Sequence, residues 1–236
     1  MSRFTYYPPI LGYHRVGEFQ GDHVPTVSAR TFERHLAFLA RGRYRVVGLP
    51  EILSGPGEGR PLPRRSVAIT FDDGYAETHE VAWPLLKQFG FPSTVFVAPA
   101  EVGCPGFSTW DQVTAMAQDG MTIGCHTMHH SYLPLVGEDR LPEELVESKR
   151  VIEARIGRPV TLLSYPVGGF TPRVQSAVQQ AGYAAACTTN RASPHPGIDP
   201  YALRRIKITE RDRNPVLFMA KLSGYYDLFR RLRDPA

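Results

Sequence analysis

The chain has 236 residues, a formal net charge of +4 and a sequence pI near 9.0. This length allows one large domain or two small ones, with ordinary apolar and charged fractions for a globular protein. The positive charge is too dilute for a nucleic-acid binder, in which lysine and arginine form a basic stripe among aromatic residues. Three cysteines without a CxxC spacing argue against a disulfide framework and a structural zinc knot.

Strand and helix patterns alternate along the chain. The expected strands are 10–16, 44–47, 67–71, 93–97, 121–124, 160–164, 183–188 and 203–208. The expected helices are 28–40, 49–53, 77–89, 109–118, 142–156, 171–180 and 215–232, with a loop rich in glycine and proline at 54–65. Such alternation predicts a mainly parallel sheet, and seven or so strand–helix units favour a closed or nearly closed barrel in a single domain over 1–236.

The sequence also bears on the cellular compartment. No apolar run approaches a membrane span, and the first residues lack the apolar segment of a signal peptide. As written, the sequence predicts a cytoplasmic protein; a chain whose export signal has been removed would instead work in the periplasm or outside the cell. The basic amphipathic helix expected at 215–232 could touch a membrane surface, although packing on the barrel is the interpretation we favour.

A strand-type run at 67–71 ends in two adjacent carboxylates, Asp72 and Asp73, followed by Gly74. In α/β proteins, catalytic and binding groups collect where strands end. Two adjacent ionised carboxylates repel each other, so burying them is costly unless a cation compensates. On this segment alone, a cation site and a solvated turn are equally good interpretations.

Two histidines favour the cation site. His126 and His130 follow the expected strand 121–124 at a spacing that places two imidazoles on one face of a helical turn. Two histidines and one carboxylate are the usual ligands of an open catalytic zinc or similar divalent ion. His129 lies between them and would point elsewhere.

These segments resemble the signature motifs of a known family. Residues 70–74 (TFDDG) and 126–130 (HTMHH) resemble the first two motifs of the polysaccharide deacetylases, also called carbohydrate esterase family 4 or NodB-homology enzymes. Residues 164–168 (SYPVG) resemble the third motif of the exopolysaccharide deacetylases, and 13–16 (YHRV) resemble the poly-N-acetylglucosamine branch. The resemblance covers roughly residues 8–210. It implies a distorted (β/α)7-type barrel.

The resemblance also implies roles for individual residues. Asp73, His126 and His130 would hold a divalent metal, first of all Zn2+, with Ni2+, Co2+ or Fe2+ as alternatives. Asp72 would be the general base, and the backbone N–H of Tyr165 would stabilise the oxyanion. The sequence departs from the family in two ways: no arginine occurs in 161–164, and no late Leu-x-His motif supplies the general acid.

The sequence therefore leaves open which residue is the general acid and which charged residue lies near Asp72 and tunes it. His14 is our candidate for the acid, and His195 is the second choice. Either Arg204 or Arg205, near the last expected strand, would face Asp72, and the sequence does not distinguish them.

The implied function is metal-dependent hydrolysis of N-acetyl groups on N-acetylhexosamine units. The substrate would be a polysaccharide, or an oligosaccharide or lipid-linked precursor. Two alternatives remain: a small-molecule amide or imide hydrolase on the same fold, and a carbohydrate-binding protein without turnover.

Overall fold

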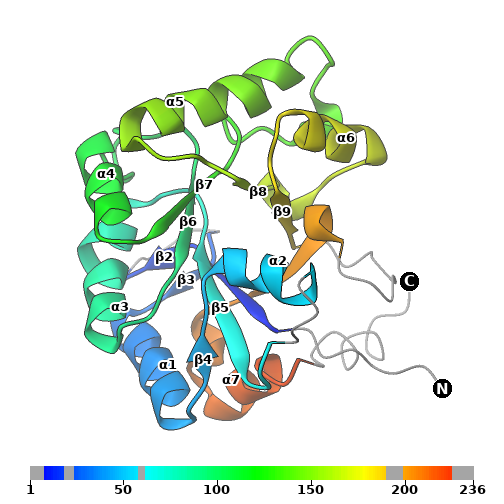
Figure 1. Ribbon diagram of the computed structural model, residues 1–236. Coiled ribbons are helices and arrows are strands. Elements are labelled where there is room, and N and C mark those ends of the chain that lie inside the picture. The colour runs from blue at the N-terminus through cyan, green and yellow to red at the C-terminus, as the bar shows by residue number, and fades with distance from the viewer. Residues whose placement is uncertain (1–7, 19–23, 58–61, 190–198, 225–236) are drawn as a thin grey trace, which may run out of the picture.

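Seven parallel strands form a closed barrel in the computed structural model, which describes residues 8–18, 24–57, 62–189 and 199–224 (Figure 1). In barrel order they are β1 (Ile10–Tyr13), β10 (Leu203–Lys207), β9 (Ala185–Thr188), β8 (Leu162–Ser164), β7 (Thr122–Cys125), β6 (Thr94–Val97) and β5 (Ser66–Phe71). Pairing of β5 with β1 closes the ring. The predicted (β/α)7-type barrel is confirmed.

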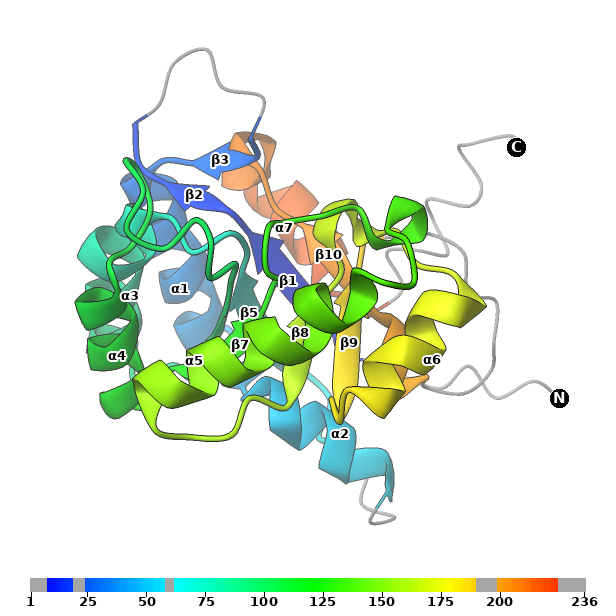
Figure 2. The ribbon, with the colours of Figure 1, turned by 90° about the horizontal axis from the view of Figure 1, so that it is seen from above.

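Two short additions lie outside the ring. Strand β4 (Arg45–Val46) pairs with the first residues of β5, and β2 (Arg15–Val16) pairs with β3 (Thr26–Val27) as a separate parallel ribbon (Figure 2). The helices lie around the strands (Figures 1 and 2). They are α1 (Ala29–Arg41), α2 (Leu49–Gly57), α3 (Trp83–Phe89), α4 (Trp110–Gln118), α5 (Ser148–Ile156), α6 (Pro172–Gln180) and α7 (Pro215–Lys221).

The barrel interior is apolar at its N-terminal end. Alternate strand residues share one buried cluster with Leu49 and Ile52 of α2. The strand members are Ile10, Ala68, Phe96, Leu162, Ala185, Cys187 and Leu203. Because side chains alternate along a strand, this set points inward, and α2 covers that end of the barrel. The apolar cluster leaves the C-terminal end of the barrel free to hold polar side chains.

The structure differs from the predicted helices at four places. The helices expected at 77–89 and 142–156 each contain a π-helical turn, η1 (Thr78–Ala82) and η3 (Glu143–Glu147), before α3 and α5. The π-helical turn η1 accommodates Pro84, which has no N–H and would clash with a backbone carbonyl in a regular helix.

The other two differences concern helix ends. Helix α2 continues to Gly57, where a loop was predicted. Helix α7 ends at Lys221 rather than 232, and Gly224 has a left-handed φ of 74° that cannot continue a helix. Residues 225–232 lie outside the described ranges. Within those ranges, the chain has no helix that combines the length and apolarity needed to cross a bilayer.

Candidate active site

Polar side chains converge at the C-terminal end of the barrel. Asp72 and Asp73 follow β5, His126 follows β7, and His14 follows β1. Parallel strands end at the same edge of a barrel, so residues far apart in sequence meet there. Arg205 reaches the same place from within β10.

Asp73, His126 and His130 form a compact group of potential metal ligands. Asp73 Oδ1 lies 3.2 Å from His126 Nε2 and 3.3 Å from His130 Nε2. The three ligand atoms all lie within 4.8 Å of one another. His126 Nδ1 lies 2.8 Å from the Ser164 carbonyl oxygen, which can only accept, so Nδ1 carries the proton and Nε2 keeps its lone pair for a cation.

The donor set fits a divalent cation. Asp73 Oδ1 is buried and accepts no hydrogen bond among the described residues, which is costly unless a cation faces it. Burial raises the pKa of Asp73, but His126 and His130 outweigh burial and hold that pKa well below its ordinary value. One carboxylate and two imidazole nitrogens match an open zinc-type site.

The backbone at these ligands is unusual. Asp73 has a φ of 69° and His130 a φ of 54°, both in the left-handed region that non-glycine residues rarely occupy. Gly74 follows with a φ of 74°, and a Cβ on it would lie 2.9 Å from Val97 Cγ1. Such conformations persist only where surrounding contacts enforce them, and they cluster at functional sites.

Asp72 is held by a buried arginine. Arg205 donates from Nη1 to Oδ1 at 2.6 Å and from Nη2 to Oδ2 at 2.5 Å. Burial raises the pKa of Asp72, but the Arg205 guanidinium outweighs burial and lowers that pKa below its ordinary value. Asp72 is therefore ionised at neutral pH.

Arg205 itself is fixed by two hydroxyl groups. Nη1 lies 3.2 Å from Thr70 Oγ1, and Nη2 lies 2.8 Å from Ser164 Oγ. Both hydroxyls belong to recognisable motifs, but sequence reasoning assigned them no role. The period of two along a strand places Thr70 on the same side as Asp72, and this signal could have identified it. The same alternation in β10 turns Arg205 inward and Arg204 away, which decides between the two arginines.

His14 lies beside Asp72. Its Nε2 is 3.9 Å from Asp72 Oδ2, and its Nδ1 is buried without a hydrogen-bond partner among the described residues. Burial lowers the pKa of His14, so the imidazole is neutral at neutral pH. His195, the second candidate for the acid, lies outside the described residues.

Tyr165 is placed differently from the expectation. Its side chain is buried and stacks on Phe170, and its hydroxyl donates to the Tyr201 carbonyl at 3.1 Å. Its backbone N–H, the predicted oxyanion donor, donates to the Cys187 carbonyl at 3.0 Å. This N–H could serve an oxyanion only by sharing or giving up that hydrogen bond.

The family is shown by comparison with known proteins. A family model described as polysaccharide deacetylase matches residues 59–186, more than half of the chain. The chain belongs to the polysaccharide deacetylase family. The family predicted from segments 70–74 and 126–130 is thereby confirmed. His14 and Arg205 lie outside the matched range and are placed at the site by the structure.

Individual relatives agree with this assignment. YxkH of Bacillus subtilis (strain 168) is 29% identical over 201 residues, covering 85% of this chain and 71% of YxkH. The poly-beta-1,6-N-acetyl-D-glucosamine N-deacetylase of Staphylococcus aureus (strain MRSA252) is 25% identical over 199 residues, covering 78% of this chain and 68% of that enzyme.

Solved structures share the fold. IcaB from Ammonifex degensii superposes with a TM-score of 0.77 at 27% identity, covering 90% of this chain and 96% of IcaB. The Streptococcus pyogenes deacetylase PplD, in complex with acetate, superposes with a TM-score of 0.84 at 22% identity, covering 91% of this chain and 97% of PplD. At that identity, the second likeness speaks for the fold alone.

Proposed function

We propose that this protein is a divalent-metal-dependent hydrolase that removes N-acetyl groups from N-acetylhexosamine units. The substrate is an N-acetylated polysaccharide, or an oligosaccharide or lipid-linked precursor, and residues 1–236 act as one domain. The observation that carries the proposal is the meeting of Asp73 Oδ1 with the Nε2 atoms of His126 and His130, next to the second carboxylate, Asp72. The named activity of the staphylococcal relative supports the substrate class.

Asp73, His126 and His130 would hold the cation, with Zn2+ first among Zn2+, Ni2+, Co2+ and Fe2+. A divalent cation in such a site activates water and polarises a carbonyl oxygen. The protein's contribution is to keep the three ligand atoms together. The hydrogen bond from His126 Nδ1 to the Ser164 carbonyl orients one of the two imidazole rings.

Asp72 would act as the general base. Both of its oxygens accept hydrogen bonds from Arg205, yet an ionised carboxylate has about four lone-pair sites, so it can still accept a proton from water. The guanidinium lowers its basicity but keeps it ionised in a buried place. The proton of the attacking water therefore moves to Asp72 as the water oxygen bonds to the N-acetyl carbonyl carbon.

His14 would return a proton to the leaving nitrogen. A neutral imidazole must first gain a proton, and Asp72, 3.9 Å away, gains one when water attacks. A proton passing from Asp72 to His14 and then to the nitrogen allows the C–N bond to break, releasing acetate and an amine. The Tyr165 N–H remains a proposed oxyanion donor, with its hydrogen bond to Cys187 as the observation against it.

Acetate release and metal content together test the proposal. The metal-stripped protein is reloaded with each candidate ion and incubated with N-acetylglucosamine oligomers and an acetylated polymer. Asp73→Ala should lose bound metal and activity, whereas Asp72→Asn should keep metal and lose acetate release. His79→Ala, outside the ligand group, is the control and should keep both.

The outcomes separate the roles. No acetate from any substrate with any of the four ions would refute the deacetylase proposal. Stoichiometric metal in Asp73→Ala would refute the ligand set, and near-normal turnover by Asp72→Asn would refute the base. His14→Ala should lower turnover strongly; if His195→Ala does so instead, the acid is His195.

A further inference from the structure

Glu144 is a buried carboxylate behind the loop that carries His130. It belongs to η3 and is 0% exposed. Oε2 accepts hydrogen bonds from the backbone N–H groups of Met128 at 3.0 Å and His129 at 3.1 Å. Oε1 lies 2.8 Å from Ser131 Oγ and 3.0 Å from His129 Nδ1. One side chain thus contacts three residues that lie within two positions of His130.

The loop needs external support because its backbone is strained. Thr127 and His130 have φ values of 66° and 54°, which non-glycine residues rarely adopt. The loop has local anchors as well: the His126 N–H donates to the Val97 carbonyl at 2.8 Å, and the Ser131 N–H donates to Thr127 Oγ1 at 3.1 Å. A third anchor, the Ala100 N–H, donates to the Met128 carbonyl at 3.0 Å, while Glu144 accepts from the N–H of the same residue and of His129.

A second connection joins the same helix to the start of the loop. Ser148 Oγ donates to the Glu144 carbonyl at 2.6 Å, and Cys125 Sγ lies 3.2 Å from Ser148 Oγ. Cys125 directly precedes His126. The helix that begins with η3 is therefore tied to both ends of the segment that carries the two histidines.

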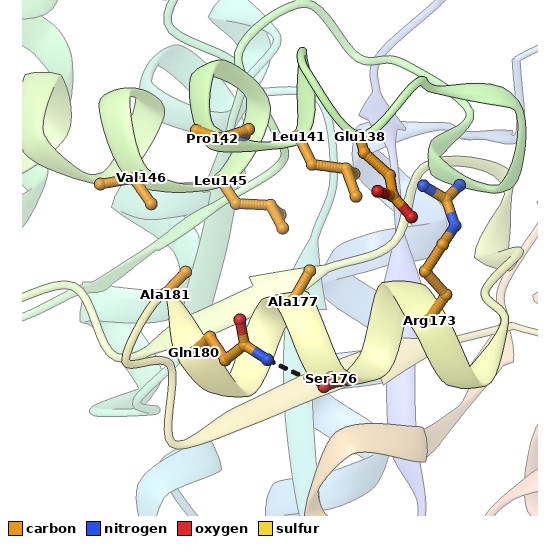
Figure 3. A pocket seen from close by; sticks show the side chains of 10 residues that line it. All are labelled: Glu138, Leu141, Pro142, Leu145, Val146, Arg173, Ser176, Ala177, Gln180 and Ala181. Carbon is orange, nitrogen blue, oxygen red and sulfur yellow. Dashed lines mark hydrogen bonds between the residues drawn. The ribbon is translucent and has the colours of Figure 1, made fainter.

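The neighbours of Glu144 face elsewhere. Leu145 and Val146 line a pocket between this helix and α6, on the outside of the barrel (Figure 3). Figure 3 shows their side chains on the side of the helix that faces Ala177 of α6 and Ala181, which follows α6. Glu147 is exposed and pairs with Arg150 at 2.8 Å. Glu147 therefore provides a matched control in the same turn.

The Glu144 carboxylate is ionised, so it can accept hydrogen bonds but not donate them. Burial raises the pKa of Glu144, but the hydrogen bonds from Ser131 and His129 outweigh burial and lower that pKa below its ordinary value. An ionised carboxylate is an acceptor only, which matches the two backbone N–H groups, the hydroxyl and the imidazole N–H around it.

We propose that Glu144 is a positioning residue for the metal-ligand loop. By accepting hydrogen bonds from Met128, His129 and Ser131, it holds His130 where its Nε2 meets Asp73 and His126. The inference rests on the proposed metal site. Partners that orient ligands in this way typically change metal affinity about 10–100-fold when they are removed.

Zinc affinity measures this role directly, without activity. Metal-stripped protein is titrated with zinc against a competing chelator, and metal-free thermal midpoints are recorded in parallel. Glu144→Ala should raise the zinc Kd about 10–100-fold. Glu144→Gln should retain most of the affinity, because its amide oxygen can accept from both backbone N–H groups while its NH2 faces Ser131 Oγ and His129 Nδ1, each of which can accept. Glu147→Ala should match the wild type.

A second variant protects the test against simple unfolding. Ser131→Ala removes one hydrogen bond from Glu144 and should raise the zinc Kd less than Glu144→Ala, with the metal-free midpoint unchanged. A folded Glu144→Ala with wild-type zinc affinity would overturn the proposal. If Glu144→Ala does not fold, wild-type affinity in Ser131→Ala would overturn it instead. Failure of the wild type to bind any of the four candidate ions would refute the metal site itself, which is a different result.

Discussion

Replacing Arg205 with methionine removes the positive charge that faces Asp72 inside the barrel. Methionine roughly keeps the length of the side chain, so the change mainly removes charge and hydrogen bonds. The Arg205 and Asp72 side chains are only 1% and 4% exposed, so water cannot replace the guanidinium without rearrangement. Two short hydrogen bonds to Asp72 are lost, together with those to Thr70 and Ser164.

The expected cost follows from this burial. Removing one partner of a buried ion pair destabilises a protein by about 3–5 kcal/mol because the other charge remains buried and uncompensated. In the wild type, the lowered pKa of Asp72 makes the pair stabilising above the unfolded-state pKa of about 3.9, and this stabilisation is lost as pH falls through the folded-state pKa. In the variant, burial still raises the pKa of Asp72, and only the weaker effects of His126 and His14 oppose it, so that pKa should rise. The penalty should therefore shrink as pH falls and Asp72 takes up a proton.

The assay is urea unfolding of metal-free protein between about pH 5 and about pH 8. Arg205→Met, Asp72→Asn and the double variant complete a cycle, and Arg204→Met is the control on the same strand. The double variant should be more stable than Arg205→Met, since no uncompensated charge remains. A cost for Arg205→Met below about 1 kcal/mol, the range of exposed ion pairs, or a cost independent of pH, would refute the reasoning.

Two further predictions concern the core. Burial lowers the pKa of His35, so below about pH 6.5 the unfolded chain binds a proton that the native chain does not. The free energy of unfolding should therefore decrease as the pH is lowered. His35→Gln should remove this part of the pH dependence in urea titrations, and an unchanged pH dependence would contradict the prediction. A Cβ on Gly124 would lie 2.4 Å from Phe96 Cδ1, so Gly124→Ala should cost about 1–3 kcal/mol. Thermal unfolding against the control Gly48→Ala, whose Cβ meets nothing closer than 3.6 Å, measures this, and equal midpoints would contradict it.

Several features of this protein were predictable from the sequence because they are local. The strand expected at 67–71 is found at Ser66–Phe71, and that expected at 121–124 at Thr122–Cys125. Apolar runs ended by turn residues mark such strands without reference to the rest of the chain. Alternation of strands and helices then predicted the parallel barrel. Parallel strand ends predicted that one carboxylate of the pair Asp72 and Asp73 would meet the histidines, and the family resemblance implied that it is Asp73.

Features that depend on contacts between distant segments needed the tertiary structure. Arg204 and Arg205 are chemically identical in sequence, and only the register of β10 in the closed ring turns Arg205 toward Asp72. The Tyr165 N–H looked available, but pairing of β8 with β9 gives it the Cys187 carbonyl. Glu144 carried no sequence signal, because its partners belong to a loop more than ten residues earlier. A motif names the reacting groups, but burial, register and hydrogen-bond partners decide what each group can do, and these arise only when the ring closes.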